Sequence, residues 1–267
     1  MGNPVAVILN ADDISSDEMQ RIARWTNLSE TTFILQPEHA DADYKLRIFT
    51  ASRELPFAGH PSLGSCCAWL HNGGVPKGRE YVIQECGIGL IKLSQGPGPN
   101  MLAFEAPEPF RMGPLDEADV ELIAKGLGIQ RSDIIRHSWC DNGPKWRGIM
   151  LRSMEDVLAV KPNDACLLGM DVGIIGPVVN NTTLDFGYEV RAFCDEGGVI
   201  VEDPVTGSLN AALAQWLMRE GVTPRNYVSR QGTVIDRNGR VELSMNDDNK
   251  VWVGGLARVC IDGTIAL

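Results

Sequence analysis

The chain has 267 residues, of which 44% are hydrophobic and 22% charged, an ordinary composition for a globular protein with one large domain or two smaller ones. Its formal net charge of -11 argues against binding to nucleic-acid phosphates or to an anionic membrane surface, since both need clustered Lys and Arg. A small anionic substrate remains compatible with this charge, because backbone N–H groups can create a local positive field.

Several classes of protein lack their usual sequence signals here. No stretch reaches the length of a transmembrane helix, and the N-terminus has no charged leader before a cleavable apolar segment, so we expect a cytoplasmic protein. The seven cysteines are odd in number and form no Cys-x-x-Cys pair, so neither a disulfide framework nor a zinc site is indicated. Glycine-rich nucleotide motifs are also missing from the sequence, and we expect no metal and no cofactor.

The first half of the chain predicts strands with one early helix. That helix is expected to be capped by Ser15 or Ser16 and to end near Thr26. Strands are expected at residues 3–9, 31–35, 46–50, 81–93 (two strands about a Gly-Ile-Gly turn) and 101–104. Ser29 and Glu30 then lie on the connection that enters the second of these strands.

A turn of sequence Glu-Leu-Pro-Phe-Ala-Gly-His-Pro occupies residues 54–61, between a strand and an apolar helix that runs through Trp69 and Leu70. A helix start presents unpaired N–H groups and a partial positive charge, so a carboxylate can bind there without a basic side chain. His60 would lie at that point. The alternative is a packing turn whose histidine is merely hydrogen-bonded in place.

The second half of the chain begins at a candidate linker, Glu-Ala-Pro-Glu-Pro, at residues 105–109. Helices are expected from Glu117 to Leu127, from a Ser153 cap, and from Leu209 to Met218. Strands are expected at residues 172–175, 188–193, 199–201, 227–232, 241–245, 251–253 and, by alternation, 255–267.

Two strand–turn–helix junctions resemble one another. Arg-Ile-Phe at 47–49 precedes Pro-Phe-Ala-Gly-His at 56–60, and Arg-Ala-Phe at 191–193 precedes Pro-Val-Thr-Gly-Ser at 204–208. Each following helix contains Trp-Leu near its end and leads to a strand that opens with Tyr-Val. The repeat predicts two similar α+β lobes, residues 1–108 and 109–267, with a last strand at about 257–267 returning to the N-terminal lobe. If the lobes faced each other, both helix starts would point into one anion-binding cleft.

The segments Asn27–Glu30, Arg47–Thr50, Glu54–Pro61 and Glu202–Ser208 together resemble the phenazine-biosynthesis isomerase family, often called PhzF-like. The resemblance covers nearly the whole chain in order. It implies the two-lobed α+β fold of diaminopimelate epimerase, with a mostly antiparallel sheet or barrel around a central helix in each pseudo-symmetric lobe. It also implies a homodimeric isomerase that needs no cofactor and moves a proton within a small, cyclic carboxylate of dihydroxyanthranilate type.

The resemblance also implies the site residues. The proton-transferring glutamate of the family falls on Glu30, and the histidine and aspartate of its two turns fall on His60 and Asp203. Since a carboxylate that both removes and returns a proton must titrate near the working pH, burial should raise the pKa of Glu30. The expected catalytic residues are thus Glu30, His60 and Asp203, and the expected substrate-binding residues are Ser29, Gly59, Gly207 and Ser208.

Two features depart from the family pattern. The family usually has a strand of Asp-Ala-Phe type before its Gly-Asn-Pro turn, whereas this sequence starts at Met1-Gly2-Asn3, which would leave a sheet edge unpaired. Ala51 stands where the family commonly has proline.

Two alternatives stay open at this point. An amino-acid epimerase of the same fold would need a cysteine before the glycine of each turn, where this chain has Ala58 and Thr206. A non-catalytic metabolite-binding protein would keep the turns but exchange no proton with its ligand.

Overall fold

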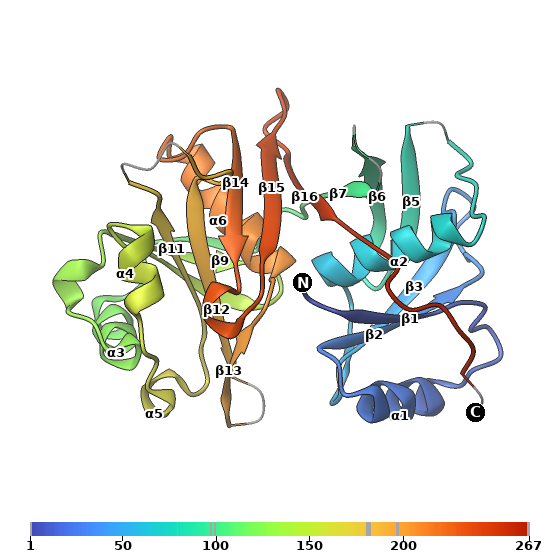
Figure 1. Ribbon diagram of the computed structural model, residues 1–267, viewed down its shortest axis with the longest axis horizontal. Coiled ribbons are helices and arrows are strands. Elements are labelled where there is room, and N and C mark those ends of the chain that lie inside the picture. The colour runs from blue at the N-terminus through green and yellow to red at the C-terminus, as the bar shows by residue number, and fades with distance from the viewer. Residues whose placement is uncertain are drawn as a thin grey trace. The chain divides into compact units, whose positions relative to one another are not determined.

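The computed structural model describes residues 2–78, 80–96, 98, 100–179, 183–195 and 198–265, and the chain forms two compact units (Figure 1). The N-terminal unit consists of residues 4–105 and 254–267, and the C-terminal unit of residues 1–3 and 106–253. The chain therefore changes unit at Glu105/Ala106 and again at Val253/Gly254. The sequence placed the lobe boundary three residues further on, and it did not assign residues 1–3 to the C-terminal lobe.

The strands of the N-terminal unit follow the order β1-β2-β3-β5-β6-β7, with β4 paired to β3. Helix α2 contacts β1 and β2 at one end of this row and β7 at the other, so the row curls around the helix. The elements are β1 (Val5–Ile8), α1 (Ser16–Thr26), β2 (Glu30–Leu35), β3 (Tyr44–Phe49), β4 (Glu54–Leu55), α2 (Gly59–His71), β5 (Tyr81–Cys86), β6 (Gly89–Gln95) and β7 (Met101–Glu105).

The C-terminal unit repeats this plan around α6, which contacts β15 on one side and β9 and β10 on the other. Its strand order is β16-β15-β14-β12-β11-β10-β9-β8, with β13 paired to β12; residues 251–253 of β16 belong to this unit and residues 254–256 to the N-terminal unit. Its first elements are β8 (Arg111–Gly113), α3 (Glu117–Leu127), η1 (Arg131–Asp133), β9 (Arg136–Asp141), β10 (Lys145–Met150), α4 (Met154–Ala159) and α5 (Asp164–Leu167). They are followed by β11 (Asp171–Pro177), β12 (Tyr188–Asp195), β13 (Ile200–Asp203), α6 (Gly207–Arg219), β14 (Asn226–Gln231), η2 (Thr233–Ile235), β15 (Gly239–Met245) and β16 (Val251–Leu256).

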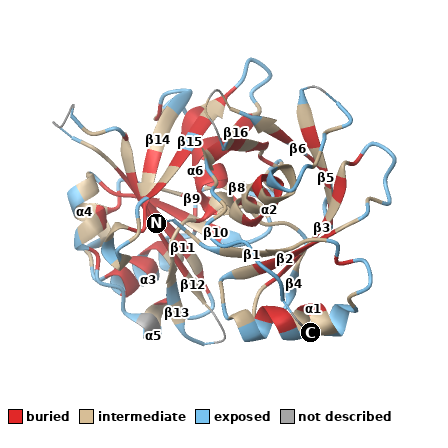
Figure 2. Cartoon of the chain, turned by 45° about the vertical axis from the view of Figure 1, so that its right-hand side comes forward, coloured by how far each residue is buried: buried red, intermediate tan, exposed pale blue. Residues whose placement is uncertain are grey.

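Local sequence explains where the helices begin and which sides they bury. Ser15 and Glu18 cap α1 reciprocally: the Ser15 hydroxyl accepts from the Glu18 N–H at 3.3 Å, and the Glu18 carboxylate accepts from the Ser15 N–H at 3.0 Å. Helix α1 buries one side, whereas α6 is buried along most of its length, as expected for a helix enclosed by strands (Figure 2). None of the helices among the described residues is long and apolar enough to cross a membrane.

The predicted repeat is present as two copies of one motif, β2-β3-β4-α2-β5 and β11-β12-β13-α6-β14. In each copy the first two strands pair antiparallel, and the second strand pairs parallel to the strand after the helix. Each copy has an arginine clamp, in which an arginine donates two hydrogen bonds to the glutamate two residues before the turn proline. Arg47 binds Glu54 at 2.8 and 2.7 Å, and Arg191 binds Glu202 at 2.9 and 2.8 Å.

Strand register identifies which residues correspond in the two motifs. Phe49 lies opposite Thr31, and Phe193 lies opposite Val172. Counting back one residue, Glu30 at the start of β2 corresponds to Asp171 at the start of β11, and the second residues of the two helices, His60 and Ser208, correspond as well.

The prediction of a final strand at residues 255–267 is wrong for the described part of that segment. Strand β16 ends at Leu256, and residues 257–265 form no strand; residues 266–267 lie outside the described residues. The apolar residues that produced the alternation do not share a buried face, since Ile261 is 91% exposed.

Candidate active site

Helix α2 begins directly after the first predicted turn. Ala58 is its N-cap residue, in an extended conformation, and no side chain hydrogen-bonds to the helix start. Gly59 and His60 are its first two helical residues. The backbone N–H groups of this first turn are therefore not satisfied by a side-chain cap, which is the arrangement that favours an anion at a helix N-terminus.

Glu30 lies near the start of α2 and is the first residue of β2. The strand begins one residue earlier than the sequence predicted. Asn27, with a φ of 52°, ends α1 in the left-handed conformation and turns the chain toward β2, and Ser29 on this connection is exposed. The Glu30 Oε2 and His60 Nε2 atoms are 3.3 Å apart, and these side chains are only 16% and 15% exposed. The fold thus brings together two of the three predicted catalytic residues.

Burial makes His60 a neutral imidazole near pH 7. It lowers the pKa of His60 from 6.5 to about 4, and a hydrogen bond to the backbone of Pro4 acts in the opposite direction. Nε2 makes no hydrogen bond of its own, so Nδ1 is the nitrogen that donates to Pro4 and Nε2 keeps its lone pair. A lone pair facing a carboxylate oxygen is repulsive, and a proton on the carboxyl group removes the repulsion. When Glu30 is protonated, its carboxyl group can therefore donate to the Nε2 lone pair of His60.

The second predicted turn lies in the C-terminal unit, between β13 and α6. Asp203 ends β13; its Oδ2 accepts from the Thr206 hydroxyl at 2.5 Å and its Oδ1 from the Asn3 side-chain amide at 3.0 Å. Gly207 is the first residue of α6 and Thr206 its N-cap. Both oxygens of the Asp203 carboxylate are thus oriented by hydrogen-bond donors.

Ser208 is held from the β9–β10 hairpin of the same unit. The Trp146 indole N–H donates to the Ser208 hydroxyl at 3.1 Å, and the Asn142 amide donates to the Ser208 carbonyl at 2.8 Å. Because the hydroxyl oxygen already accepts from Trp146, its own proton is available to donate elsewhere.

Sequence reasoning missed the residues that support the second turn, namely Asn3, Asn142, Trp146 and Gln231. Only Gln231 carried a usable signal. It is a wholly buried glutamine in a strand, and a polar side chain at an inward position requires hydrogen-bond partners.

Neither turn carries a cysteine for thiol chemistry, because Ala58 and Thr206 occupy the N-cap positions where an epimerase of this fold would have cysteines. Burial raises the pKa of Cys66 and of Cys140 to about 12, so these thiols stay protonated. Within the described ranges, no three His, Cys, Asp or Glu side chains gather as a metal site would require.

The curved sheet around one helix in each unit is the diaminopimelate-epimerase-like fold of known structures, which confirms the predicted α+β, mostly antiparallel fold. The family model described as phenazine biosynthesis-like protein (PhzC-PhzF) matches residues 1–263, and the chain belongs to this family.

Known proteins agree with this assignment. The chain is 36% identical to antisense-enhancing sequence 1 of Schizosaccharomyces pombe, over 98% of this chain and 93% of that protein. It is 37% identical to trans-2,3-dihydro-3-hydroxyanthranilate isomerase of Pseudomonas chlororaphis, over 82% of this chain and 76% of that protein. Among solved structures, a PhzF-family protein of Bacillus anthracis superposes with a TM-score of 0.79 at 21% identity, covering 96% of this chain and 90% of that chain. The protein is an isomerase of the PhzF family.

Proposed function

We propose that the protein is a cofactor-independent isomerase that shifts a proton, and with it a double bond, in a small cyclic carboxylate of the kind used in phenazine-type secondary metabolism. The observation that carries the proposal is the 3.3 Å approach of Glu30 to a buried, neutral His60 at the start of α2. The sequence similarity to trans-2,3-dihydro-3-hydroxyanthranilate isomerase supports this substrate class.

The proposed reaction needs no net change of atoms or electrons. Glu30 in its carboxylate form takes a proton from one ring carbon, the C–H electron pair moves into the conjugated system, and the same carboxyl group returns the proton to a second carbon. A raised pKa for Glu30, predicted from burial, would suit both steps. The N–H groups at the start of α2, including that of Gly59, stabilise the negative charge that develops on the substrate.

While Glu30 carries the proton, its carboxyl group donates a hydrogen bond to the Nε2 lone pair of the neutral His60, which keeps the carboxyl group oriented. Asp203, Gly207 and Ser208 are proposed to bind polar groups of the substrate, as is Ser29 beside Glu30. Homodimeric assembly and a cytoplasmic location stay predictions of the sequence.

The test is deuterium incorporation. The proton on the Glu30 carboxyl group can exchange with solvent before it is returned, so wild-type protein in D2O should introduce one deuterium into trans-2,3-dihydro-3-hydroxyanthranilate or into a related cyclic carboxylate, detected by mass spectrometry and NMR. The Glu30→Gln variant should lose roughly a thousandfold or more of this exchange, since it removes the group that carries the proton. Glu38→Gln, which changes a 75% exposed carboxylate of the same unit, is the matched control and should keep wild-type exchange.

Retained exchange in folded Glu30→Gln protein would refute the role of Glu30. No exchange by the wild type with any cyclic carboxylate, together with measurable binding, would instead favour a metabolite-binding protein.

A further inference from the structure

A buried chain of hydrogen bonds ends on Asp203. The Ser229 hydroxyl donates to Asn210 Oδ1 at 2.6 Å, and Asn210 Nδ2 donates to Gln231 Oε1 at 2.8 Å. Gln231 Nε2 donates to the Thr206 hydroxyl oxygen at 2.9 Å, and the Thr206 hydroxyl donates to Asp203 Oδ2 at 2.5 Å. We call this chain the Gln231 relay. Ser229, Asn210, Gln231 and Thr206 are 0 to 7% exposed, so water does not compete for these bonds.

The direction of the Gln231 relay is fixed by backbone groups. Asn210 Nδ2 also donates to the Thr206 carbonyl at 2.9 Å. Exchanging the amide O and N atoms of Asn210 would place its oxygen against this carbonyl oxygen, so the orientation of the amide is fixed. Gln231 is fixed twice: its Oε1 accepts from the Thr206 backbone N–H at 3.0 Å, and its Nε2 donates to the Asp203 carbonyl at 3.0 Å. Because the Thr206 oxygen receives a proton from Gln231, its own proton is committed to Asp203.

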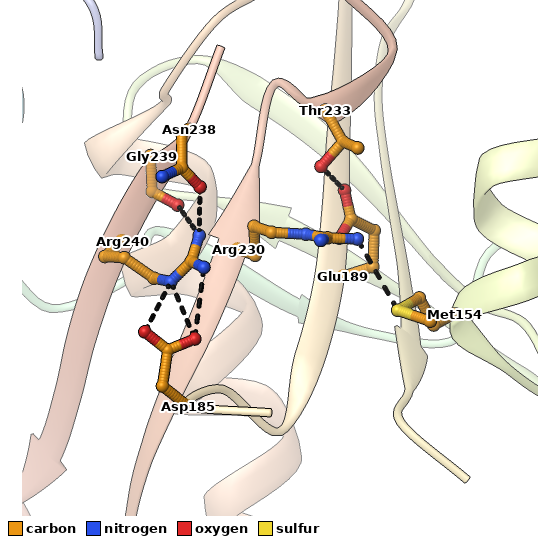
Figure 3. A network of polar contacts seen from close by, with 8 residues as sticks. All are labelled: Met154, Asp185, Glu189, Arg230, Thr233, Asn238, Gly239 and Arg240. Atoms are coloured by element: carbon orange, nitrogen blue, oxygen red, sulfur yellow. Dashed lines mark hydrogen bonds and ion pairs between the residues drawn. The ribbon is translucent and has the colours of Figure 1, made fainter. Parts of the chain in front are cut away.

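Two ion pairs lie on the strands next to the relay. Arg191 on β12 and Glu202 on β13 form the buried arginine clamp. On β14, Ser229 and Gln231 point toward α6, whereas Arg230 between them points to the opposite face and binds Glu189 at 2.5 Å. Figure 3 shows this second network, in which Thr233 also donates to Glu189 at 2.6 Å, together with the neighbouring Arg240–Asp185 pair. The neutral relay thus connects the interior of the unit to Asp203.

We propose that Gln231 is a positioning residue that acts through Thr206 to keep the Asp203 carboxylate ionised and fixed in orientation, as a hydrogen-bond acceptor for an amino or hydroxyl group of the substrate. The relay stabilises the ionised form of Asp203, because the hydrogen bond that Thr206 donates is stronger to a carboxylate than to a protonated carboxyl group. An ionised carboxylate accepts hydrogen bonds and donates none. The substrate group at Asp203 is accordingly a donor. This assignment of a substrate group rests on the proposed function, whereas the ionisation of Asp203 does not.

The test compares Thr206→Val, which removes the hydroxyl at nearly constant shape, with Thr206→Ser, which keeps it. Aspartate labelled with 13C at the carboxyl carbon reports the titration of Asp203 by NMR, and Asp203→Asn identifies its signal. In Thr206→Val the titration midpoint of Asp203 should rise by about one pH unit, and in Thr206→Ser it should stay within a few tenths of wild type. For a substrate with an amino or hydroxyl group, Thr206→Val should raise KM about tenfold with little change in kcat, and Thr206→Ser should restore KM.

Gln231→Met removes the amide of Gln231 and should raise the titration midpoint of Asp203, as Thr206→Val does. If Gln231→Met does not fold, the comparison of Thr206→Val with Thr206→Ser still decides the proposal. An unchanged midpoint in folded Thr206→Val, or equal shifts in Thr206→Val and Thr206→Ser, would overturn the proposal. If the wild type turns over no substrate, the proposed function fails, and the NMR titration still decides the relay.

Discussion

The turns before α2 and α6 belong to two copies of one backbone motif, yet the buried hydrogen-bond chains behind them end on different groups. In the N-terminal unit, Tyr44 donates to Gln84 at 3.1 Å, Gln84 to Ser62 at 3.0 Å, and Ser62 to the carbonyl of Ala58 at 2.8 Å. That chain ends on the backbone. In the C-terminal unit the corresponding N-cap residue is threonine, and its hydroxyl extends the chain to a carboxylate.

The second helical residue also differs, with His60 in one copy and Ser208 in the other. The first copy sets an imidazole 3.3 Å from Glu30, whereas in the second copy a serine hydroxyl accepts a hydrogen bond from Trp146. The backbone motif thus supplies two equivalent helix starts that carry different side chains. In the proposed function, these side chains give proton transfer to the first copy and substrate binding to the second.

The arginine clamps provide the largest test of this comparison. Arg191 is 2% exposed and also donates to the carbonyls of Val157 and Val160, whereas Arg47 is 22% exposed and its partner Glu54 is 43% exposed. Arg191→Met should lower the free energy of unfolding by about 3–5 kcal/mol, because it leaves a buried carboxylate and two carbonyls without their donor. Arg47→Met, the matched change in the other copy, should cost at most about 1 kcal/mol. Urea unfolding of the full chain measures both, and equal losses would show that burial does not distinguish the clamps.

The next largest effect is a pH dependence of stability at His60, since its counterpart Ser208 does not titrate. The folded-state pKa of His60 is about 4 and its ordinary value is 6.5, so between these pH values the unfolded chain binds a proton that the folded chain does not. The stability from His60 is therefore present above pH 6.5 and is lost as the pH falls toward 4. The loss amounts to about 2–3 kcal/mol.

The measurement is the difference in unfolding free energy between wild type and His60→Gln, followed from pH 7 to pH 4.5. Carboxylates remote from His60 affect both proteins alike and cancel in this difference, and repeating the comparison in the Glu30→Gln background removes the contribution of Glu30, 3.3 Å away. A difference that is constant across the window would mean that His60 binds protons equally in the folded and unfolded chain, so that burial does not lower its pKa.

Gly173 tests a smaller distinction between the copies. A Cβ atom on Gly173 would lie 2.1 and 2.6 Å from the terminal carbons of Leu209, the wholly buried third residue of α6. At the corresponding position of the N-terminal unit, Thr32 has a side chain that hydrogen-bonds to Ser65 at 2.8 Å. Gly173→Ala should therefore destabilise the protein by about 1–3 kcal/mol through overpacking. Gly263→Ala, whose Cβ would meet nothing within 4 Å, is the control, and thermal unfolding should separate the two variants clearly.

Many elements could be predicted from the sequence because their signals are local. The Ser15 cap, the helix from Glu117 to Leu127 with its left-handed Gly128, and the Ser153 cap are all confirmed, since capping and glycine conformation depend on a few neighbouring residues. The strand predicted at the C-terminal end failed because alternation indicates a strand only when one face is buried, and burial is not a local property.

The sequence by itself determined the repeat, the two turns, the family and the identity of the expected site residues, because each of these is a pattern of residue types along the chain. Only the tertiary structure decided that Glu30 lies 3.3 Å from His60, that His60 is buried enough to be neutral, and that Gln231 is connected to Asp203 through Thr206. These properties join residues 28 to 30 positions apart, and desolvation and hydrogen-bond direction depend on what surrounds a group in space.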